Sequence, residues 1–412
     1  MKLVIGKMDI EERLRDKLSE ISAILGTKAY ENKEIGVLSG VSGIALFQFY
    51  YSKLLDDDTY AEIGAETITE AIELINKGFS YPTFCTGIAG ACWVLELLKE
   101  EGFIALEDDF LSAELDVFLL EVMKSDIQEE NYDFLHGAMG YGFYFFKRYQ
   151  NTTSEHLKDK YKVYISKLIK ALRHSSISCD QGVWWKSVLS EEKNLVGCNL
   201  GLSHGVSSII NFLSRLVVYE DFYEEAHKLL SHTVAYILSC KNIDKSCVSS
   251  FPNWFVYKGE INANSRLAWC YGDLGIGISL LRAGEVLKDD YLYNEAIAIL
   301  KHSTKRRDIE EAGIVDAGLC HGAYGVFHIY SYLYKKTKIE IFKETSVFWA
   351  QQALDMGVHK NGFAGYLVFK GTEKEKYKPE VNLLEGIAGI GLAIISHLAP
   401  FDTKWDECLL IS

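Results

Sequence analysis

The chain has 412 residues, of which 48% are hydrophobic and 24% charged, as in a soluble globular protein with a large core. Its 43 Lys and Arg against 57 Asp and Glu give a net charge of −14, which argues against a nucleic-acid partner or an anionic-lipid surface. No stretch holds the roughly 18 to 20 apolar residues that insertion into a membrane requires, and the start turns charged too early for a signal peptide. Nine scattered cysteines favour reduced thiols, so we expect a cytoplasmic protein.

A short glycine motif recurs seven times along the chain. Its copies begin at Gly40, Gly87, Gly137, Gly205, Gly272, Gly322 and Gly386. All but the fourth have a second glycine three residues later, where the fourth has Ser208. Each copy leads into a run that is apolar almost all round, such as residues 44–51 and 390–395, which is typical of helices buried inside a protein. The motif therefore predicts seven inner helices.

An amphipathic segment with the spacing of a helix lies ahead of each glycine motif. These segments cover residues 9–25, 60–77, 108–124, 155–173, 221–239, 290–302 and 340–354. They predict seven outer helices with one solvated face each. Helix pairs can stack as an open solenoid or close into a ring, and the scarcity of charges in the inner segments favours the ring. We expect an all-α fold of the α/α toroid type, with seven inner and seven outer helices.

Three long connections interrupt this regularity, over residues 175–198, 241–264 and 357–381. Each holds an aromatic stretch: V-W-W-K-S-V from Val183, N-W-F-V-Y from Asn253 and G-Y-L-V-F from Gly365. Such stretches predict short hairpins, which would form a small β-rich appendage or a rim over the mouth of the ring. Loops of this length are often functional, and a structural flap is an equally good interpretation. Residues 1–412 are expected to form one domain.

In a closed ring, the residues just before the seven turns converge around one mouth. From the third turn onward they can do chemistry: Asp133 with His136, His204, Arg266 with Cys270, Cys320 with His321, and Glu385. Cysteine and histidine are ligands that zinc prefers, and three protein ligands leave one position open, as in catalytic zinc sites. The sequence therefore predicts a zinc centre formed by Cys270, Cys320 and His321.

Each of these residues, taken alone, also has a plain structural interpretation. A cysteine in an apolar context is more often a core residue than a ligand, and lone histidines such as His136 and His204 are commonly structural. Asp133 can cap a helix, and Arg266 can pair with an acidic neighbour. Tyr271 packs more often than it reacts, although its hydroxyl can donate to a substrate. Only their arrangement around one mouth favours chemistry.

The turns resemble those of the LanC-like lanthionine synthetases, the cyclases of class I lantibiotic biosynthesis. The resemblance covers essentially the whole chain and rests on R-L-A-W-C-Y-G-D-L-G from Arg266, C-H-G-A-Y-G from Cys320, L-G-L-S-H-G from Leu200, Y-D-F-L-H-G from Tyr132 and L-L-E-G-I-A-G from Leu383. It implies an α/α toroid with a central zinc ion. It also implies a reaction in which cysteine thiols of a dehydrated precursor peptide add to dehydroalanine or dehydrobutyrine and form thioether rings.

The resemblance implies a role for individual residues. Matching positions make Cys270, Cys320 and His321 the zinc ligands and His204, Asp133 and Arg266 the catalytic residues. We expect Tyr271, His136 and Glu385 to contact the substrate. His204 would protonate the enolate, Asp133 would orient His204 or accept the thiol proton, and Arg266 would stabilise the enolate oxygen. His136 stands where a member of the family has an acidic residue, and Glu385 has no obvious partner in the sequence.

Two other functions are compatible with these motifs. LanC-like proteins of higher organisms resemble enzymes that add glutathione to dehydroamino acids in proteins, and a toroid can also bind peptides without catalysis. Other α/α toroids, such as prenyltransferase β-subunits and glycosidases, lack the W-C-Y-G and C-H-G motifs. For a lantibiotic cyclase, the resemblance further implies a lantibiotic dehydratase and an ABC exporter as partners, at the inner face of the membrane.

Overall fold

Seven helices form the inner wall of a ring in the computed structural model, which describes residues 9–27, 32–190, 195–244, 246–256, 262–371 and 376–412. They are α2 (Val41–Leu55), α4 (Ile88–Glu100), α6 (Ala138–Asn151), α8 (Val206–Leu216), α10 (Asp273–Leu287), α13 (Ala323–Thr337) and α15 (Ile387–Leu398). The N-cap of every one is the first glycine of a motif. The glycine motif thus marked the start of each inner helix correctly.

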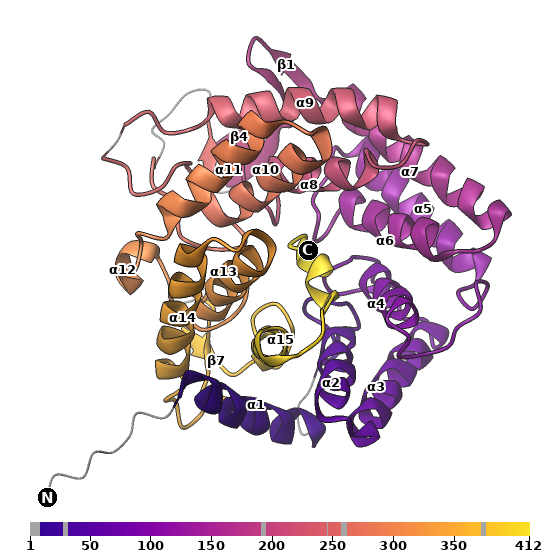
Figure 1. Cartoon of the computed structure of the whole chain (residues 1–412). Coiled ribbons are helices and arrows are strands. Elements are labelled where there is room, and N and C mark those ends of the chain that lie inside the picture. The colour runs from indigo at the N-terminus through magenta and orange to yellow at the C-terminus, as the bar shows by residue number, and fades with distance from the viewer. Residues whose placement is uncertain (1–8, 28–31, 191–194, 245, 257–261, 372–375) are drawn as a thin grey trace, which may run out of the picture.

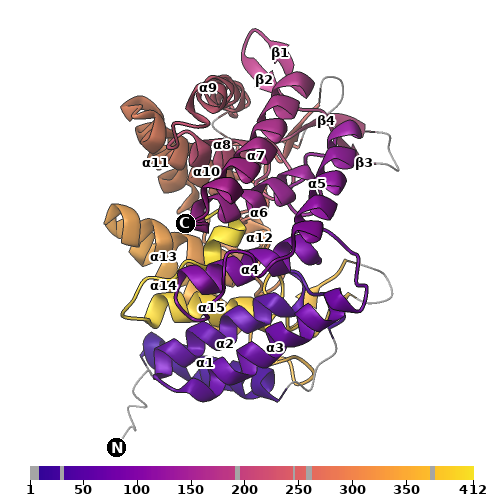
Figure 2. The ribbon, with the colours of Figure 1, turned by 90° about the vertical axis from the view of Figure 1, so that its right-hand side faces the viewer.

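Seven outer helices alternate with the inner ones along the chain. They are α1 (Ile10–Gly26), α3 (Asp58–Asn76), α5 (Ala113–Gln128), α7 (Glu155–Ser175), α9 (Tyr223–Ser239), α11 (Asp290–Ser303) and α14 (Glu340–Asp355). The last inner helix, α15, packs against the first, α2, which closes the ring (Figures 1 and 2). The predicted α/α toroid is therefore confirmed. A short helix, α12 (Ile309–Ala312), and a 3-10 helix, η1 (Trp405–Leu409), lie outside this alternation.

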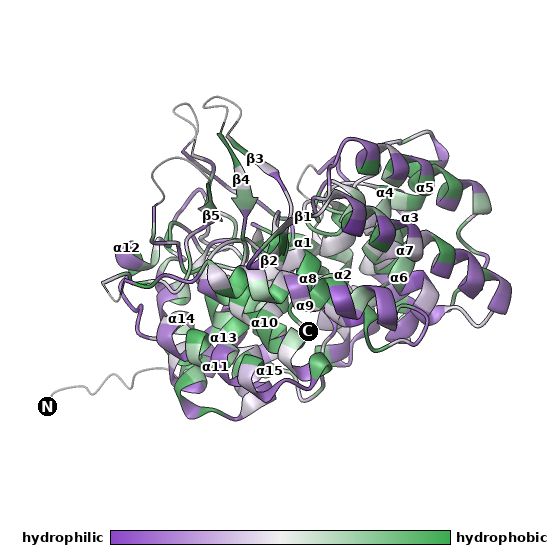
Figure 3. Ribbon diagram, turned by 90° about the horizontal axis from the view of Figure 1, so that it is seen from above, coloured by the Kyte–Doolittle hydropathy of each residue, from purple (hydrophilic) through white to green (hydrophobic). Residues whose placement is uncertain are grey.

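The two layers differ in burial as the sequence pattern predicts. Every residue at positions 88–98 of α4 is buried, whereas the outer helix α1 buries one stripe that includes Leu14, Leu18 and Leu25. Figure 3 shows the same difference as hydrophilic residues on the outer helices and hydrophobic residues between the layers. None of the described helices is long and apolar enough to cross a membrane.

The second glycine of each motif allows the inner helix to touch the turn that precedes it. A Cβ atom on Gly389 would overlap the carbonyl oxygen of Leu383, and Gly325 has the same relationship to Leu319. At the fourth turn Ser208 replaces this glycine, and its hydroxyl donates a hydrogen bond of 2.7 Å to the carbonyl of Gly205. The serine is accommodated because its side chain folds back onto its own turn.

Short antiparallel strands occupy the three long connections. They are β1 (Ile177–Cys179) with β2 (Gly182–Trp184), then β3 (Ser187–Ser190), β4 (Leu195–Asn199) and β5 (Trp254–Phe255), and finally β6 (Val368–Phe369) with β7 (Tyr377–Lys378). Figure 3 shows β3, β4 and β5 beyond the ends of the helices. The predicted β-rich appendage is present. Tyr257, the last residue of one aromatic stretch, lies outside the described residues.

The last ten residues fill the middle of the ring, a feature that the sequence analysis did not predict (Figure 1). Trp405 is fully buried there. The indole N–H of Trp269 donates to the carbonyl of Leu409 at 2.6 Å, and the side-chain amide of Asn211 donates to Leu410 at 2.9 Å. Because Trp269 directly precedes Cys270, this segment supports the turn that carries a predicted metal ligand.

Candidate metal centre and active site

Two turns bring three metal-ligating side chains together. The sulfur atoms of Cys270 and Cys320 and a ring nitrogen of His321 lie within 4.8 Å of one another. A tetrahedral zinc ion with bonds of about 2.0 to 2.3 Å holds its ligand atoms less than about 4 Å apart, so small side-chain movements suffice to fit one ion. The backbone also joins the two turns, since the N–H of Cys270 donates to the carbonyl of Cys320 at 3.3 Å.

The charges of this cluster suit a cation. The pKa of Cys270 is lowered to about 5, because the thiol of Cys320 donates a hydrogen bond to its sulfur and because His321 and Arg266 add positive charge, which together outweigh burial. Burial lowers the pKa of His321, but hydrogen bonds to Asp316 and Cys270 outweigh it and raise this pKa to about 10. A thiolate that is stabilised by the protons of neighbouring groups can bind a metal ion in place of those protons.

Asp316 is a residue of this centre that the sequence analysis missed. Its side chain is 2% exposed, and its Oδ2 lies 3.4 Å from Nε2 of His321. The same carboxylate accepts hydrogen bonds from the backbone N–H groups of Gly318 at 3.0 Å and Phe369 at 3.1 Å. A carboxylate behind a metal-ligating histidine fixes the orientation of its ring. One signal in the sequence pointed to it: Asp316 precedes Cys320 by the same spacing by which Arg266 precedes Cys270.

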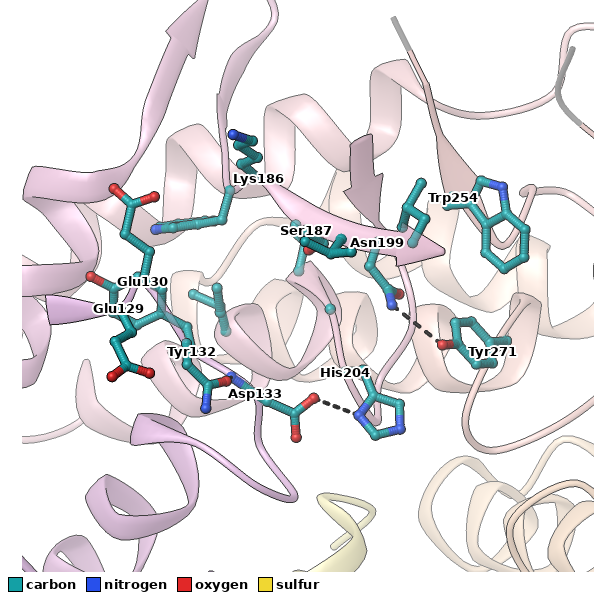
Figure 4. A pocket seen from close by; sticks show the side chains of 17 residues that line it. Glu129, Glu130, Tyr132, Asp133, Lys186, Ser187, Asn199, His204, Trp254 and Tyr271 are labelled. Carbon is teal, nitrogen blue, oxygen red and sulfur yellow. Dashed lines mark hydrogen bonds and ion pairs between the residues drawn. The ribbon is translucent and has the colours of Figure 1, made fainter. Parts of the chain in front are cut away.

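His204 and Asp133 come from different turns and face each other (Figure 4). Nδ1 of His204 lies 2.5 Å from Oδ2 of Asp133. The other carboxylate oxygen of Asp133 accepts hydrogen bonds from the N–H groups of Leu135 and His136, both at 2.8 Å. Asp133 therefore stabilises its own turn with one oxygen and holds His204 with the other.

This pairing favours the charged form of both residues. Burial opposes the two charges, but the mutual hydrogen bond and attraction outweigh it, so the pKa of Asp133 is lowered and the pKa of His204 is raised. The charge of Cys270 adds to the rise in the pKa of His204, which links the pair to the metal-ligating cluster. Nε2 of His204 makes no hydrogen bond with any described residue and is left for a substrate.

A cavity of about 700 Å³ opens beside the pair (Figure 4). Asp133, His204 and Tyr271 line it together with residues from the turn after α5 and from β3, β4 and β5. The hydroxyl of Tyr271 accepts a hydrogen bond of 3.3 Å from the side-chain amide of Asn199, and the ring of Trp254 meets the tyrosine ring edge-on at 6.3 Å. Tyr271 therefore stands in the cavity wall with its hydroxyl held in place.

The other six predicted site residues do not line this cavity: they are the three of the metal-ligating cluster, together with His136, Glu385 and Arg266. His136 is exposed, and its ring stacks on that of His204 with centroids 6.3 Å apart. Glu385, which had no obvious partner in the sequence, forms an ion pair with Lys370. Arg266 is exposed and makes no hydrogen bond or ion pair within the described part of the chain, yet its charge lowers the pKa of Cys270. The partner of Glu385 was missed because Lys370 lies in a long connection without periodicity.

Comparison with known proteins identifies the family. A family model described as lanthionine synthetase C-like protein matches residues 32–410. The chain belongs to this family. Nisin biosynthesis protein NisC of Lactococcus lactis subsp. lactis is 22% identical to this lanthionine synthetase C-like protein over 448 residues, which cover 100% of this chain and 97% of NisC. Glutathione S-transferase LANCL1 of Danio rerio is 23% identical over 358 residues, with 84% of this chain and 82% of LANCL1 covered.

A solved structure of nisin cyclase has the same fold as this lanthionine synthetase C-like protein. The two superpose with a TM-score of 0.71 at 19% sequence identity, covering 96% of this chain and 97% of nisin cyclase. The resemblance read from the turn motifs thus identified both the family and the fold correctly.

Proposed function

We propose that this lanthionine synthetase C-like protein is a zinc-dependent peptide cyclase. It would add cysteine thiols of a dehydrated lantibiotic precursor peptide to dehydroalanine or dehydrobutyrine in the same peptide and so form thioether rings. The observation that carries this proposal is the meeting of Cys270, Cys320 and His321 with the His204 and Asp133 pair at one end of the ring. The similarity to NisC, whose name assigns it to nisin biosynthesis, and to nisin cyclase supports the same activity.

Cys270, Cys320 and His321 would hold the zinc ion, with Asp316 fixing the histidine ring. When bound, zinc acts as a Lewis acid. It lowers the pKa of a substrate thiol from its usual value of about 8.5, so that the thiolate is available near neutral pH. Cys270 and Cys320 contribute two negative sulfurs, which keep the charge of the centre low and leave a substrate sulfur nucleophilic.

The chain's own residues complete the addition of S–H across the alkene. The substrate thiol would release its proton to solvent as it becomes a thiolate. Attack of the thiolate on the β-carbon forms the C–S bond as the alkene π bond breaks, and the resulting enolate takes a proton from His204 at Cα; solvent then returns a proton to His204. His204 is the general acid, and Nε2 delivers this proton because Nδ1 is occupied by Asp133. Both oxygens of Asp133 are already engaged, which supports an orienting role for it over removal of the thiol proton. Arg266 stabilises the enolate oxygen.

Three further residues contact the peptide in this proposal. Tyr271 donates its hydroxyl hydrogen to the substrate, since Asn199 already supplies the hydrogen bond that the hydroxyl oxygen accepts. His136 and Glu385, which lie outside the cavity, contact the parts of the peptide that leave it.

A lantibiotic dehydratase would supply the dehydrated peptide, and an ABC exporter would remove the product; co-purification with either protein tests that part of the proposal.

Thiol counting tests the proposed reaction. The zinc-loaded protein is incubated with a synthetic peptide that contains one cysteine and one dehydroalanine. Cyclisation leaves the mass unchanged but removes the free thiol, so alkylation followed by mass spectrometry measures it. We expect the thiol to disappear with the wild type and to remain with Cys270→Ala. His204→Asn should slow the reaction by about 10²- to 10⁴-fold. A normal rate and normal stereochemistry with His204→Asn would show that another group is the acid.

Glutathione addition is the second candidate, favoured by the similarity to LANCL1, which is named as a glutathione S-transferase. A dehydrated peptide without cysteine, supplied together with glutathione, separates the two activities. A cyclase leaves this peptide unchanged, whereas glutathione addition raises its mass by one glutathione. A protein that only binds peptides would do neither.

A further inference from the structure

The strand β3 presents a free edge to the cavity. In the three-stranded sheet β4 pairs with both β3 and β5, whereas β3 has no second partner within the described residues. Three consecutive residues of β3, Ser187, Val188 and Leu189, line the cavity. Ser187 and Val188 lie in the regularly paired part of β3, before the register shift at Leu189, so their side chains point to opposite faces of the sheet. Both border the cavity, which places the edge of β3 that lacks a partner strand at the cavity. Such an edge offers N–H and C=O groups to another extended chain.

Two unpaired carboxylates reach the same cavity from the turn after α5. Glu129 and Glu130 are exposed, and their carboxylates make no hydrogen bond or ion pair within the described residues (Figure 4). The remaining charged residues of the lining are Lys186 and the Asp133–His204 pair, whose opposite charges cancel each other. The cavity therefore carries an excess of negative charge, in a chain whose net charge is −14.

Two apolar side chains in the wall of the cavity can contact apolar residues of a peptide. Val188, in the middle of β3, is 66% exposed, and Trp254 on β5 lines the same space. β3 has four residues, and at about 3.3 Å of rise per residue it can pair with roughly four residues of another strand. Apolar side chains of such a strand would meet Val188 and Trp254, while its backbone pairs with the edge.

We propose that the peptide substrate binds as an extended strand on the free edge of β3, with a lysine or arginine side chain against Glu129 and Glu130. The inference rests on the proposed function and names its substrate class, a cationic peptide that is extended on one side of the reacting residues. The cavity connects this strand site with His204 and Tyr271, so the bound segment leads directly into the candidate active site. Glutathione carries two carboxylates and one ammonium group, and the same acidic wall disfavours it.

Fluorescence anisotropy with an unreactive probe tests the charge contacts. The probe is a labelled decapeptide with one cysteine, a serine in place of dehydroalanine and three lysines, and the protein is the zinc-loaded full chain. We expect Glu129→Gln/Glu130→Gln to raise Kd by about three- to tenfold and to weaken its salt dependence. A probe with glutamates in place of the lysines should bind the wild type more weakly. If the double variant binds the lysine probe as tightly as the wild type, the proposal is wrong.

Glu11→Gln/Glu12→Gln is the matched control, because it removes two adjacent exposed carboxylates from α1, outside the cavity. Its Kd for the lysine probe should equal that of the wild type. If this control weakens binding as much as the cavity variant does, the effect is one of net charge and the specific contact is refuted. Thermal unfolding followed by circular dichroism checks that both double variants are folded.

Backbone methylation of the probe tests the strand pairing. One peptide carries N-methyl groups at alternate residues, and a second carries them at the intervening residues. Only every second N–H of a strand points toward a given neighbour. One of the two methylated peptides should therefore lose binding, and the other should keep it. Equal binding by the two methylated peptides would refute pairing with β3.

These measurements separate the inference from the proposed function, because the probe has no alkene and binding needs no turnover. Wild-type protein that binds the probe as expected but forms no thioether on a dehydrated peptide would refute the cyclase function alone. Thioether formation with Glu129→Gln/Glu130→Gln at unchanged Kd and KM would refute the docking site alone.

Discussion

Nδ1 of His204 and Oδ2 of Asp133 lie 2.5 Å apart, although 71 residues separate them in the chain. Each stands just before the start of an inner helix, Asp133 before α6 and His204 before α8. The contact therefore exists only because the ring brings the starts of its inner helices to the same end. The carboxylate is fixed in turn by the N–H groups of Leu135 and His136. A histidine held in this way keeps its second ring nitrogen, Nε2, free of hydrogen bonds to the described residues.

Removing the charge of Asp133 should change the pH dependence of cyclisation. Pairing raises the pKa of His204, and a general acid acts in its protonated form, so activity falls as the pH rises through this pKa. Asp133→Asn removes the negative charge and lowers the pKa of His204, and the falling limb of kcat/KM against pH should move to lower pH. Asparagine can still accept the backbone hydrogen bonds at this turn, so the fold should persist. An unmoved limb would show that His204 is not the titrating acid.

The periodic parts of the chain were predictable from the sequence, and the parts without periodicity were not. Seven copies of one glycine motif locate the inner helices and bring Cys270 and Cys320 to equivalent turns. Lys370, by contrast, lies in a long connection where no repeat fixes its place, and it reaches Glu385 only in the folded chain. Trp405 is buried inside the ring, yet its segment has no glycine motif that would predict this position. Both positions depend on contacts that form only in the folded ring, which no periodic pattern of the sequence records.

Neutralising Asp316 should weaken zinc binding. Its carboxylate lies behind His321 and is anchored by the N–H groups of Gly318 and Phe369. Loss of such a carboxylate typically costs about 10- to 100-fold in metal affinity. We expect this loss for Asp316→Asn, measured by competition with a coloured chelator. Asp308→Asn, which changes the exposed N-cap of α12, is the control and should bind zinc as the wild type does. Equal affinities for the two variants would contradict the role of Asp316.

Zinc and cyclisation should be lost together when Cys270 is removed. Cys270→Ala takes away one of the three proposed ligands, and we expect neither bound zinc by elemental analysis nor loss of the peptide thiol. Cys85→Ala is the matched control, because Cys85 is also buried just before an inner helix. Its sulfur lies 3.4 Å from the hydroxyl of Ser39 and does not belong to the cluster of Cys270, Cys320 and His321. It should keep zinc and activity. Full activity of metal-free protein would refute the proposed mechanism.

The glycine motif connects the stability of the ring to the geometry of the metal centre. Gly389, at the second glycine of the last motif, touches the carbonyl of Leu383, and the carbonyl of the next residue, Leu384, accepts hydrogen bonds from the N–H groups of Leu319 and Cys320 at 3.1 and 3.0 Å. Any shift of this turn is therefore passed to Cys320.

Gly389→Ala should destabilise the fold and weaken zinc binding at the same time. The added Cβ overlaps a backbone carbonyl, which cannot rotate away as a side chain can, and overpacking of this kind costs about 1 to 3 kcal/mol. Urea unfolding measures the stability, and chelator competition measures the affinity. Gly26→Ala, at the last residue of α1, is the control: its nearest neighbour atom would be 4.0 Å from the new Cβ, and alanine is favoured over glycine in a helix by about 0.5 to 1 kcal/mol. The control should leave zinc binding unchanged. If Gly389→Ala loses stability but binds zinc normally, the turn does not transmit strain to Cys320.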